Sequence, residues 1–308
     1  MEALAIILDR PRSIALRPVM LAEPQSKGVV VRVKHTGISA GTERLLWDGS
    51  MPNFPGMGYP LVPGYETVGE VIESDDPRFK PGQCVFVPGA RCYKDVRALF
   101  GGAASHVIAD PDRLHPIDSN APELTLMALA ATAYHAVMLT TPPDLIIGHG
   151  VLGQLMARIT VAKGFPPPVV HEIKDTRMAG DGYTVIHPDE DQRRDYHTVV
   201  DASGTQEVID LCVNRIAPGG QVVLAGFYGA RLSFAFPPAF MRAARIAIAA
   251  EWQPGDLEGV RHLLDSGQLS FDGLISHSYP AATADAAYLI AFSDPDCLKM
   301  VLNWGGAA

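Results

Sequence analysis

A glycine-rich turn near the middle of the chain constrains its fold more than any other feature. The apolar run Asp144–Ile147 leads into the pattern G-x-G-x-x-G, and a helical apolar spacing follows. The first glycine permits a tight strand-to-helix turn, the second lets backbone amides approach a pyrophosphate, and the third lets the helix pack closely on the strand. The helix N-terminus also favours phosphate charge. We therefore expect a dinucleotide site at Gly148, His149, Gly150, Val151, Leu152 and Gly153.

An acidic residue after the next apolar run indicates which dinucleotide binds. Glu172 follows Val169–His171 about twenty residues after the glycine pattern, where a carboxylate binds the ribose diol of NAD and repels the 2′-phosphate of NADP. Lys174 and Arg177 are the opposing observation, and we interpret them as solvated loop charges. NAD is therefore the expected cofactor. Three positions at the ends of later strands are expected to border it: Asp201, Ser203 and Gly226.

The first part of the chain predicts a β-rich domain. Short strands broken by Gly and Pro run to about residue 121, which is typical of a barrel-type arrangement. The expected strands are Ala3–Leu8, Ile14–Arg17, Val29–His35, Thr67–Glu73, Cys84–Val87 and Ser105–Ala109, with a short helix at Thr42–Trp47.

After that point helices and strands alternate, which predicts an α/β fold with a doubly wound Rossmann parallel sheet and its ligand at the carboxyl ends of the strands. The expected strands are Leu145–Ile147, Val169–His171, Tyr183–Ile186, Thr198–Asp201, Val222–Ala225 and Ile246–Ala250. The expected helices are Leu124–Val137, Val151–Lys163, Gln206–Arg215 and Gly255–Asp265. The tail reverts to shorter elements, so we expect a catalytic domain over 1–122 and 270–308 and a dinucleotide-binding domain over 123–269.

Composition excludes several classes of partner. The formal charge is -9 and no basic run occurs, so a nucleic-acid partner is not expected. The four cysteines form no C-x-x-C pair, which is typical of a reducing cytoplasm. The N-terminal apolar run is too short for a signal peptide, and no run reaches membrane-spanning length. We expect a cytoplasmic protein without a membrane span; a homodimer is compatible with the sequence, which leaves the oligomeric state open.

Several motifs resemble the medium-chain dehydrogenase/reductase superfamily, and together they cover the whole chain. They are Gly37–Glu43 (GISAGTE), Pro63–Gly69 (PGYETVG), the glycine pattern, Asp201–Gly204 (DASG) and Pro218–Gly220 (PGG). Four longer stretches resemble a branch of that superfamily that serves bacteriochlorophyll a biosynthesis: Gly41–Trp47, Met51–Gly64, Phe86–Cys92 and Ala225–Met241. The resemblance implies a GroES-like catalytic domain and NAD-dependent oxidation of the 3-(1-hydroxyethyl) group of a bacteriochlorophyllide-type tetrapyrrole to 3-acetyl.

The chain departs from the zinc-dependent relatives where they bind metal. Ser39 and Ala40 occupy the stretch that carries their cysteine, and Tyr65 stands in place of their histidine. Of that set only Glu66 keeps a side chain able to bind zinc, and of the cysteines of the structural zinc lobe only Cys92 remains. We therefore expect no metal.

Alcohol oxidation without a metal requires side chains that hold the developing alkoxide and accept its proton. The positions that match the relatives' metal site supply five candidates: Tyr65, Thr42, Glu66, Ser39 and Glu43. The resemblance implies that Tyr65 holds the substrate oxygen and that Thr42 begins a proton relay. Each candidate also has a plainer interpretation, because Glu66 can pair with an arginine, Glu43 can cap its helix, and Tyr65 can fill the space of the metal. His149 is a further relay candidate, although packing is the favoured interpretation.

Aromatic and apolar loop residues are candidates for walls around a large flat pigment, with ordinary packing as the competing interpretation. They are Phe54, Met57, Tyr59, Phe100, Phe227, Tyr228, Phe234, Phe236 and Phe240. Arg91 and Arg97 are candidates for a propionate, with solvated arginines as the alternative. Two other functions stay open: a zinc-free quinone or enone reductase that uses NADPH, which Glu172 disfavours, and a non-catalytic pigment carrier, which the intact glycine pattern disfavours.

Overall fold

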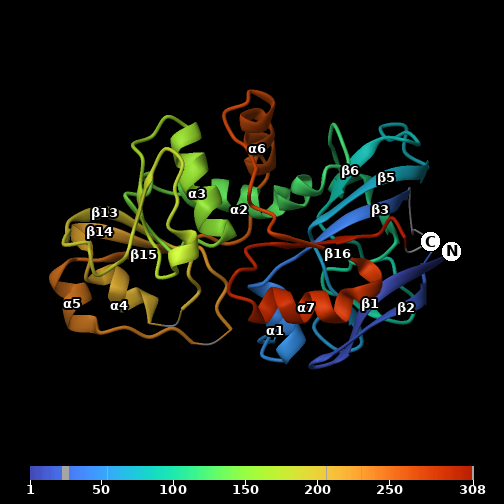
Figure 1. Cartoon of the computed structure of the whole chain (residues 1–308), viewed down its shortest axis with the longest axis horizontal. Coiled ribbons are helices and arrows are strands. Elements are labelled where there is room, and N and C mark those ends of the chain that lie inside the picture. The colour runs from blue at the N-terminus through green and yellow to red at the C-terminus, as the bar shows by residue number, and fades with distance from the viewer. Residues whose placement is uncertain (23–27, 54, 206, 230, 307–308) are drawn as a thin grey trace. The chain divides into compact units, whose positions relative to one another are not determined.

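The computed structural model describes residues 1–22, 28–53, 55–205, 207–229 and 231–306. They form two compact units (Figure 1). Unit 1 comprises Met1–Met127 and Phe271–Ala308, and unit 2 comprises Ala128–Ser270. The C-terminal segment therefore returns to the unit in which the chain began. No helix of the described ranges has the length and apolarity needed to cross a membrane.

Unit 1 is built on two β-sheets. The first has the order β2-β1-β4-β7 and consists of β1 (Glu2–Arg10), β2 (Ser13–Met20), β4 (Leu61–Val62) and β7 (Arg97–Ala98). The second has the order β16-β17-β3-β5-β6-β9, with β8 also paired to β3. Its strands are β3 (Val29–Ile38), β5 (Thr67–Ser74), β6 (Cys84–Val87), β8 (His106–Ala109), β9 (His115–Pro116), β16 (His277–Pro280) and β17 (Met300–Asn303). This is the expected GroES-like, β-rich arrangement.

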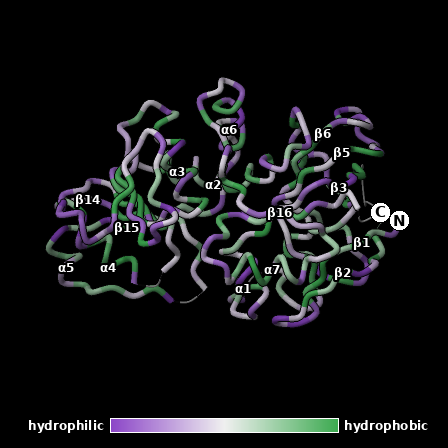
Figure 2. The backbone as a smooth tube through the Cα atoms, viewed as in Figure 1, coloured by the Kyte–Doolittle hydropathy of each residue, from purple (hydrophilic) through white to green (hydrophobic). Residues whose placement is uncertain are grey.

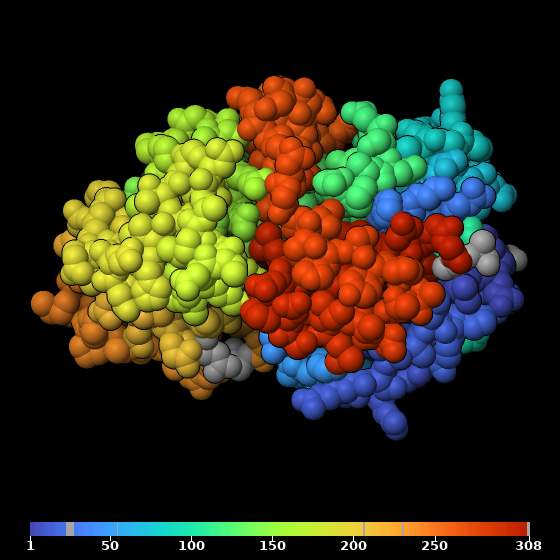
Figure 3. Space-filling view, viewed as in Figure 1, coloured from blue at the N-terminus to red at the C-terminus, as the bar shows by residue number. Residues whose placement is uncertain are grey.

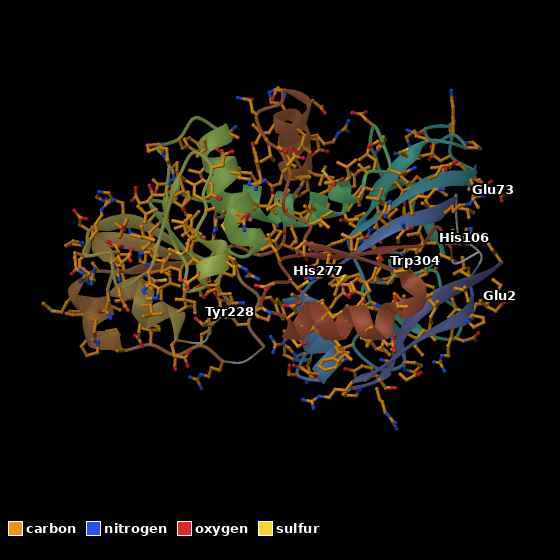
Figure 4. All side chains as sticks on the ribbon, in the orientation of Figure 1. Glu2, Glu73, His106, Tyr228, His277 and Trp304 are labelled. Atoms are coloured by element: carbon orange, nitrogen blue, oxygen red, sulfur yellow. The ribbon has the colours of Figure 1, made fainter. Side chains whose placement is uncertain are left out.

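The register of three strands in the larger sheet creates the site in unit 1. Strand β17 runs antiparallel to β3 with Met300 opposite Ile38, and β3 pairs with β5 with Thr36 opposite Thr67. The residues just before β17, just after β3 and just before β5 are therefore brought together at one end of the sheet. Trp304, labelled in Figure 4, secures this strand order because its Nε1 donates to Thr36 Oγ1 at 3.0 Å.

Helices pack against the β-sheets of unit 1. They are α1 (Thr42–Asp48) and α7 (Ala284–Ser293), with short 3-10 turns η1 (Pro111–Arg113), η2 (Pro122–Leu126) and η4 (Ala281–Thr283). Helix α7 buries Ala284, Ala287, Tyr288 and Ala291 in the main core cluster of unit 1. Figure 2 shows hydrophobic residues along strands of both units, and Figure 3 shows red C-terminal residues on the surface of unit 1. The C-terminal segment is thus part of the core of this unit.

Unit 2 contains a six-stranded, all-parallel sheet in the order β12-β11-β10-β13-β14-β15. Its strands are β10 (Leu145–Ile147), β11 (Val169–His171), β12 (Thr184–Ile186), β13 (Tyr196–Asp201), β14 (Ile216–Leu224) and β15 (Arg245–Ile248). Counted from β10, this is the 3-2-1-4-5-6 order of a doubly wound dinucleotide-binding sheet. The predicted Rossmann fold is confirmed, and its switch point lies between β10 and β13.

The helices of unit 2 follow the expected pattern, except that α2 starts later, α4 is shorter, and α5 and η3 are additional. They are α2 (Met127–Met138, whose first residue belongs to unit 1), α3 (Val151–Ala162), η3 (Asp175–Arg177), α4 (Val208–Val213), α5 (Phe236–Met241) and α6 (Asp256–Asp265). Helix α4 is shorter than the predicted helix, whose first residue, Gln206, lies outside the described residues. Helix α5 was not among the predicted helices, and Phe236 and Phe240 were expected in a loop. Its two prolines stand in its first turn, where a missing N–H costs nothing.

Candidate active site

The glycine turn of unit 2 has the geometry that a dinucleotide loop requires. Gly148 has φ +99°, which disfavours any residue with a side chain. A Cβ on Gly153 would lie 1.9 Å from the carbonyl oxygen of Gly148, so only glycine lets α3 approach β10 so closely. A Cβ on Gly150 would meet nothing within 4 Å, so the space beside this residue, which directly precedes the N-terminus of α3, is open. Val151 and Leu152 form the first turn of that helix and are half-buried.

Glu172 is bound to the backbone of the glycine turn. Its Oε2 accepts the His149 N–H at 3.0 Å, and its Oε1 accepts the N–H groups of Ile173 and Lys174 at 2.7 and 3.0 Å. The carboxylate therefore fixes the end of β11 against the turn after β10. Oε2 keeps further acceptor capacity, because an ionised carboxylate has about four lone-pair sites and the three backbone N–H groups leave one on this oxygen.

The His149 ring is fully engaged inside unit 2. Its Nδ1 lies 2.5 Å from the Arg177 carbonyl oxygen, and its Nε2 lies 2.8 Å from the Tyr183 hydroxyl. Since a carbonyl only accepts, Nδ1 carries the proton and Nε2 accepts from Tyr183. Burial lowers the pKa of His149, which keeps the ring neutral. This arrangement supports the packing interpretation and leaves no ring nitrogen free for a proton relay.

Asp201 organises the turn at the end of β13. It accepts hydrogen bonds from Ser203 N at 2.9 Å, from Ser203 Oγ at 2.6 Å, and from the hydroxyl of Tyr228, which Figure 4 labels. Burial raises the pKa of Asp201. A Cβ on Gly226 would lie 3.2 Å from Gly204 Cα, so the turns after β13 and β14 touch. The three predicted cofactor-border positions thus form one edge of the sheet.

The site in unit 1 lies where β17, β3 and β5 meet. The Lys299 ammonium forms an ion pair with Glu66, and the two side chains are 2% and 0% exposed. Gly37 leaves the space for this pair, because a Cβ there would lie 2.0 Å from Glu66 Oε2. Burial raises the pKa of Glu66, and the Lys299 charge opposes that increase. The interpretation that Glu66 pairs with an arginine is wrong, because its partner is Lys299. This lysine follows α7 in the C-terminal segment.

Glu43 is a second buried carboxyl in the same cluster. Its Oε1 accepts the Ser39 N–H at 3.2 Å, and its Oε2 accepts the Tyr288 O–H at 2.6 Å. Burial, reinforced by the negative charge of Glu66, raises the pKa of Glu43 to about 7, while the Tyr288 and Ser39 hydrogen bonds oppose that increase. The interpretation that Glu43 caps its helix is wrong, because the N-cap is Gly41 and no side chain caps it. The Glu43 side chain instead binds the segment before α1, and its pKa lies near neutrality.

Three hydroxyls adjoin these carboxyls. The Tyr65 O–H donates to Ser39 Oγ at 2.7 Å, and the phenol ring packs edge-on against Phe100 with centroids 5.3 Å apart. Burial and the Glu66 charge raise the pKa of Tyr65 above its ordinary value, against hydrogen bonds to Ser39 and Thr42. Tyr65 therefore stays a neutral phenol at physiological pH and acts as a hydrogen-bond donor. All five predicted catalytic candidates lie in one cluster.

The sequence interpretation missed two members of this cluster, Tyr288 and Lys299. Lys299 offered a signal, because it is a single charge within the apolar run Cys297–Leu302, and such a charge needs a buried partner. Tyr288 offered none, since a tyrosine in an apolar helix is ordinary core. Among the described residues no three His, Cys, Asp or Glu side chains gather in a way that could hold a metal.

The aromatic candidates divide between packing and exposure. Met57, Tyr59 and Phe100 pack on a buried cluster around Leu46 and Leu61. Phe227, Phe234, Phe236 and Phe240 are exposed on unit 2. Phe54 lies outside the described residues. Arg97 donates to the Met57 carbonyl oxygen at 2.8 Å, and Arg91 is exposed.

Comparison with known proteins agrees with both units. Residues 25–119 match the alcohol dehydrogenase GroES-like domain. The 2-desacetyl-2-hydroxyethyl bacteriochlorophyllide A dehydrogenases of Cereibacter sphaeroides and Rhodobacter capsulatus are 51% and 50% identical to the chain, each over 100% of both proteins.

Solved structures give the same fold at low identity. L-idonate 5-dehydrogenase from Escherichia coli has a TM-score of 0.84 at 17% identity, covering 99% of each chain. An alcohol dehydrogenase from Escherichia coli in complex with NADH has a TM-score of 0.82 at 17% identity, and a dehydrogenase from Sinorhizobium meliloti bound to NADP has 0.81 at 19%; both alignments cover 98% of this chain and 99% of the other.

The GroES-like unit and the Rossmann unit together define a medium-chain dehydrogenase/reductase. Its full-length relatives make it an oxidoreductase that acts on CH–OH groups. Within that class, the chain is 51% and 50% identical over its full length to the two bacteriochlorophyllide dehydrogenases. It belongs to the 2-desacetyl-2-hydroxyethyl bacteriochlorophyllide A dehydrogenase family.

Proposed function

We propose that this protein oxidises the 3-(1-hydroxyethyl) group of a bacteriochlorophyllide a precursor to 3-acetyl, with NAD as hydride acceptor, in bacteriochlorophyll a biosynthesis. Family membership supports the substrate class. The observation that carries the catalytic assignment is the buried Glu43 carboxyl, whose pKa of about 7 suits a proton acceptor at neutral pH.

We assign binding of the nicotinamide cofactor to unit 2. When bound, this cofactor would accept a hydride at its nicotinamide ring. The open space beside Gly150, which precedes the N-terminus of α3, fits a pyrophosphate. We assign binding of the adenosine ribose to Glu172, because its Oε2 accepts only one backbone N–H group and keeps acceptor capacity. Asp201, Ser203 and Gly226 line the adjoining edge. NAD is preferred over NADP because a carboxylate repels a 2′-phosphate.

We assign binding of the substrate alcohol to unit 1. Tyr65 and Ser39 hold the substrate oxygen through their hydroxyls, and Thr42 is the alternative donor beside them. Glu43 accepts the proton released from the alcohol as the C–O bond becomes a carbonyl. Glu66 is already neutralised by Lys299, so its assigned role is to maintain the electrostatics of the cluster.

A direct test is to incubate the purified protein with NAD and a 3-(1-hydroxyethyl) bacteriochlorin. We expect NADH to form in step with a shift of the pigment absorption and an acetyl product by mass spectrometry. The same assay with NADP should be much slower. Reduction of a simple quinone with NADPH, without pigment oxidation, would instead identify an enone reductase. Nucleotide titration without any turnover would identify a pigment carrier.

A further inference from the structure

Helix α7 delivers one polar group to the buried cluster of unit 1. Tyr288 is 1% exposed, and its ring packs edge-on against Phe292 with centroids 5.7 Å apart. Its neighbours on the buried face of α7 are alanines: Ala284, Ala287 and Ala291. The Tyr288 hydroxyl is therefore the group that this face of α7 contributes to the electrostatics of the site.

The environment of Glu43 is defined from every side. From α7 comes the Tyr288 O–H at 2.6 Å, and from the segment before α1 comes the Ser39 N–H at 3.2 Å. The Glu66 carboxylate acts on Glu43 with like charge, and Lys299 acts with opposite charge. Tyr65 adjoins as a neutral phenol. Of these groups, Tyr288 forms the shortest hydrogen bond to Glu43.

We propose that Tyr288 is a positioning residue for alcohol oxidation, whose hydroxyl holds the Glu43 carboxylate in the ionised form that accepts the proton. This inference rests on the proposed role of Glu43. A tyrosine suits the task because its hydroxyl both donates and accepts. It donates to the ionised carboxylate, and it can turn to accept once the proton has arrived on Glu43. Phenylalanine retains the ring and the packing but loses this support.

The test is the pH dependence of kcat/KM for pigment oxidation by the full chain. The wild type should lose activity as the pH falls through about 7, because Glu43 must be ionised to accept a proton. In Tyr288→Phe the ionised form loses a donor, so the acidic limb should move upward by about 1–2 pH units. Activity should recover to within a few-fold of wild type at high pH. The dissociation constant for NAD should not change.

Tyr93→Phe is the matched control, because its hydroxyl also donates inside unit 1, to the Gly101 carbonyl oxygen at 2.6 Å. This variant should lose a similar hydrogen bond without shifting the acidic limb of the pH profile. Glu43→Gln separates the two proposals. If Glu43→Gln keeps the wild-type limb, the proton acceptor is wrongly assigned. If Glu43→Gln is inactive but Tyr288→Phe keeps the wild-type limb, or loses activity equally at every pH, only the inference about Tyr288 is overturned.

Discussion

Lys299 and Glu66 form an ion pair inside unit 1, where neither side chain is more than 2% exposed. Two charges so deeply buried are costly to desolvate, and each depends on the other for compensation. The Lys299 charge acts on both carboxyls, since it opposes the increase that burial causes in the pKa of Glu66 and of Glu43. This single lysine therefore contributes to the electrostatics of the whole cluster.

Lys299→Met should destabilise unit 1 by about 3–5 kcal/mol, since it leaves the Glu66 charge buried without a partner. The double variant Lys299→Met with Glu66→Leu should recover much of that loss. Chemical denaturation at pH 7 would measure both. Lys34→Met is the control, because its pair with Glu70 at 3.5 Å is about one-third exposed and should contribute at most ~1 kcal/mol. Equal losses for Lys299→Met and Lys34→Met would contradict this prediction.

Tyr65→Phe should lower kcat and kcat/KM together by about ten- to a thousand-fold, because its hydrogen bond strengthens only as the alkoxide forms. Steady-state kinetics on the pigment would measure the loss, and the NAD dissociation constant should stay constant. Glu66→Gln is the companion variant: a larger kinetic loss there would make the carboxylate the main group and the phenol a spacer. Wild-type turnover in Tyr65→Phe would rule out the phenol.

Glu172→Ala should weaken NAD by about 1.5–3 kcal/mol, because a charged hydrogen-bond acceptor is lost. It should tolerate NADP better in relative terms. Since Glu172 also holds the His149 N–H, Glu172→Gln is needed to keep a backbone acceptor while removing the charge. Fluorescence titration with both nucleotides would measure the affinities, with the exposed Glu190→Gln as control. A wild type that prefers NADP would refute the ribose assignment.

Glu43 should make the stability of the wild type fall as the pH rises from 4.5 to about 7, because its pKa rises between these values on folding. In that window the folded protein keeps the proton that the unfolded chain releases, so rising pH favours unfolding. The variant Glu43→Gln lacks this pH-dependent contribution to the free energy of unfolding. The stability of the variant relative to wild type should therefore increase across the window, by at most ~3 kcal/mol. Denaturation at several pH values would measure it; a constant difference would contradict the raised pKa.

The purified protein should hold no stoichiometric zinc, and chelators should leave its activity intact. Ser39, Ala40 and Tyr65 offer no thiolate or imidazole, and Lys299 occupies one side of Glu66. Elemental analysis alongside a zinc-dependent dehydrogenase would check this. One tightly bound zinc per chain would reject it.

The Rossmann unit was predictable because each signal in it is local. The glycine turn, the strand at Val169–His171 and the acid after it lie close together in sequence, and the predicted strands Leu145–Ile147 and Val169–His171 match β10 and β11. Boundaries differed where a turn is absorbed into a strand: β14 begins at Ile216 because Pro218–Gly220 lies within it, whereas the predicted strand began at Val222.

The electrostatics of the candidate site were less predictable, because they depend on contacts between distant parts of the chain. Ser39, Thr42, Glu43, Tyr65 and Glu66 were identifiable as a set through their motifs. That Glu43 is buried against Tyr288, and that Glu66 meets a lysine, follows from the pairing of β17 with β3 and from the packing of α7. No periodicity in the sequence specifies such long-range partners.

The return of the C-terminal segment to unit 1 has a consequence for biosynthesis on the ribosome. Unit 2 contains its whole sheet between Leu145 and Ile248, so it can form while translation continues. The acid cluster cannot be completed until Lys299 and β17 have left the exit tunnel. A nascent chain stalled before that point would hold a folded dinucleotide unit and a Glu43 whose cluster still lacks the buried Lys299–Glu66 pair, so cofactor binding should precede enzymatic competence in the life of each molecule.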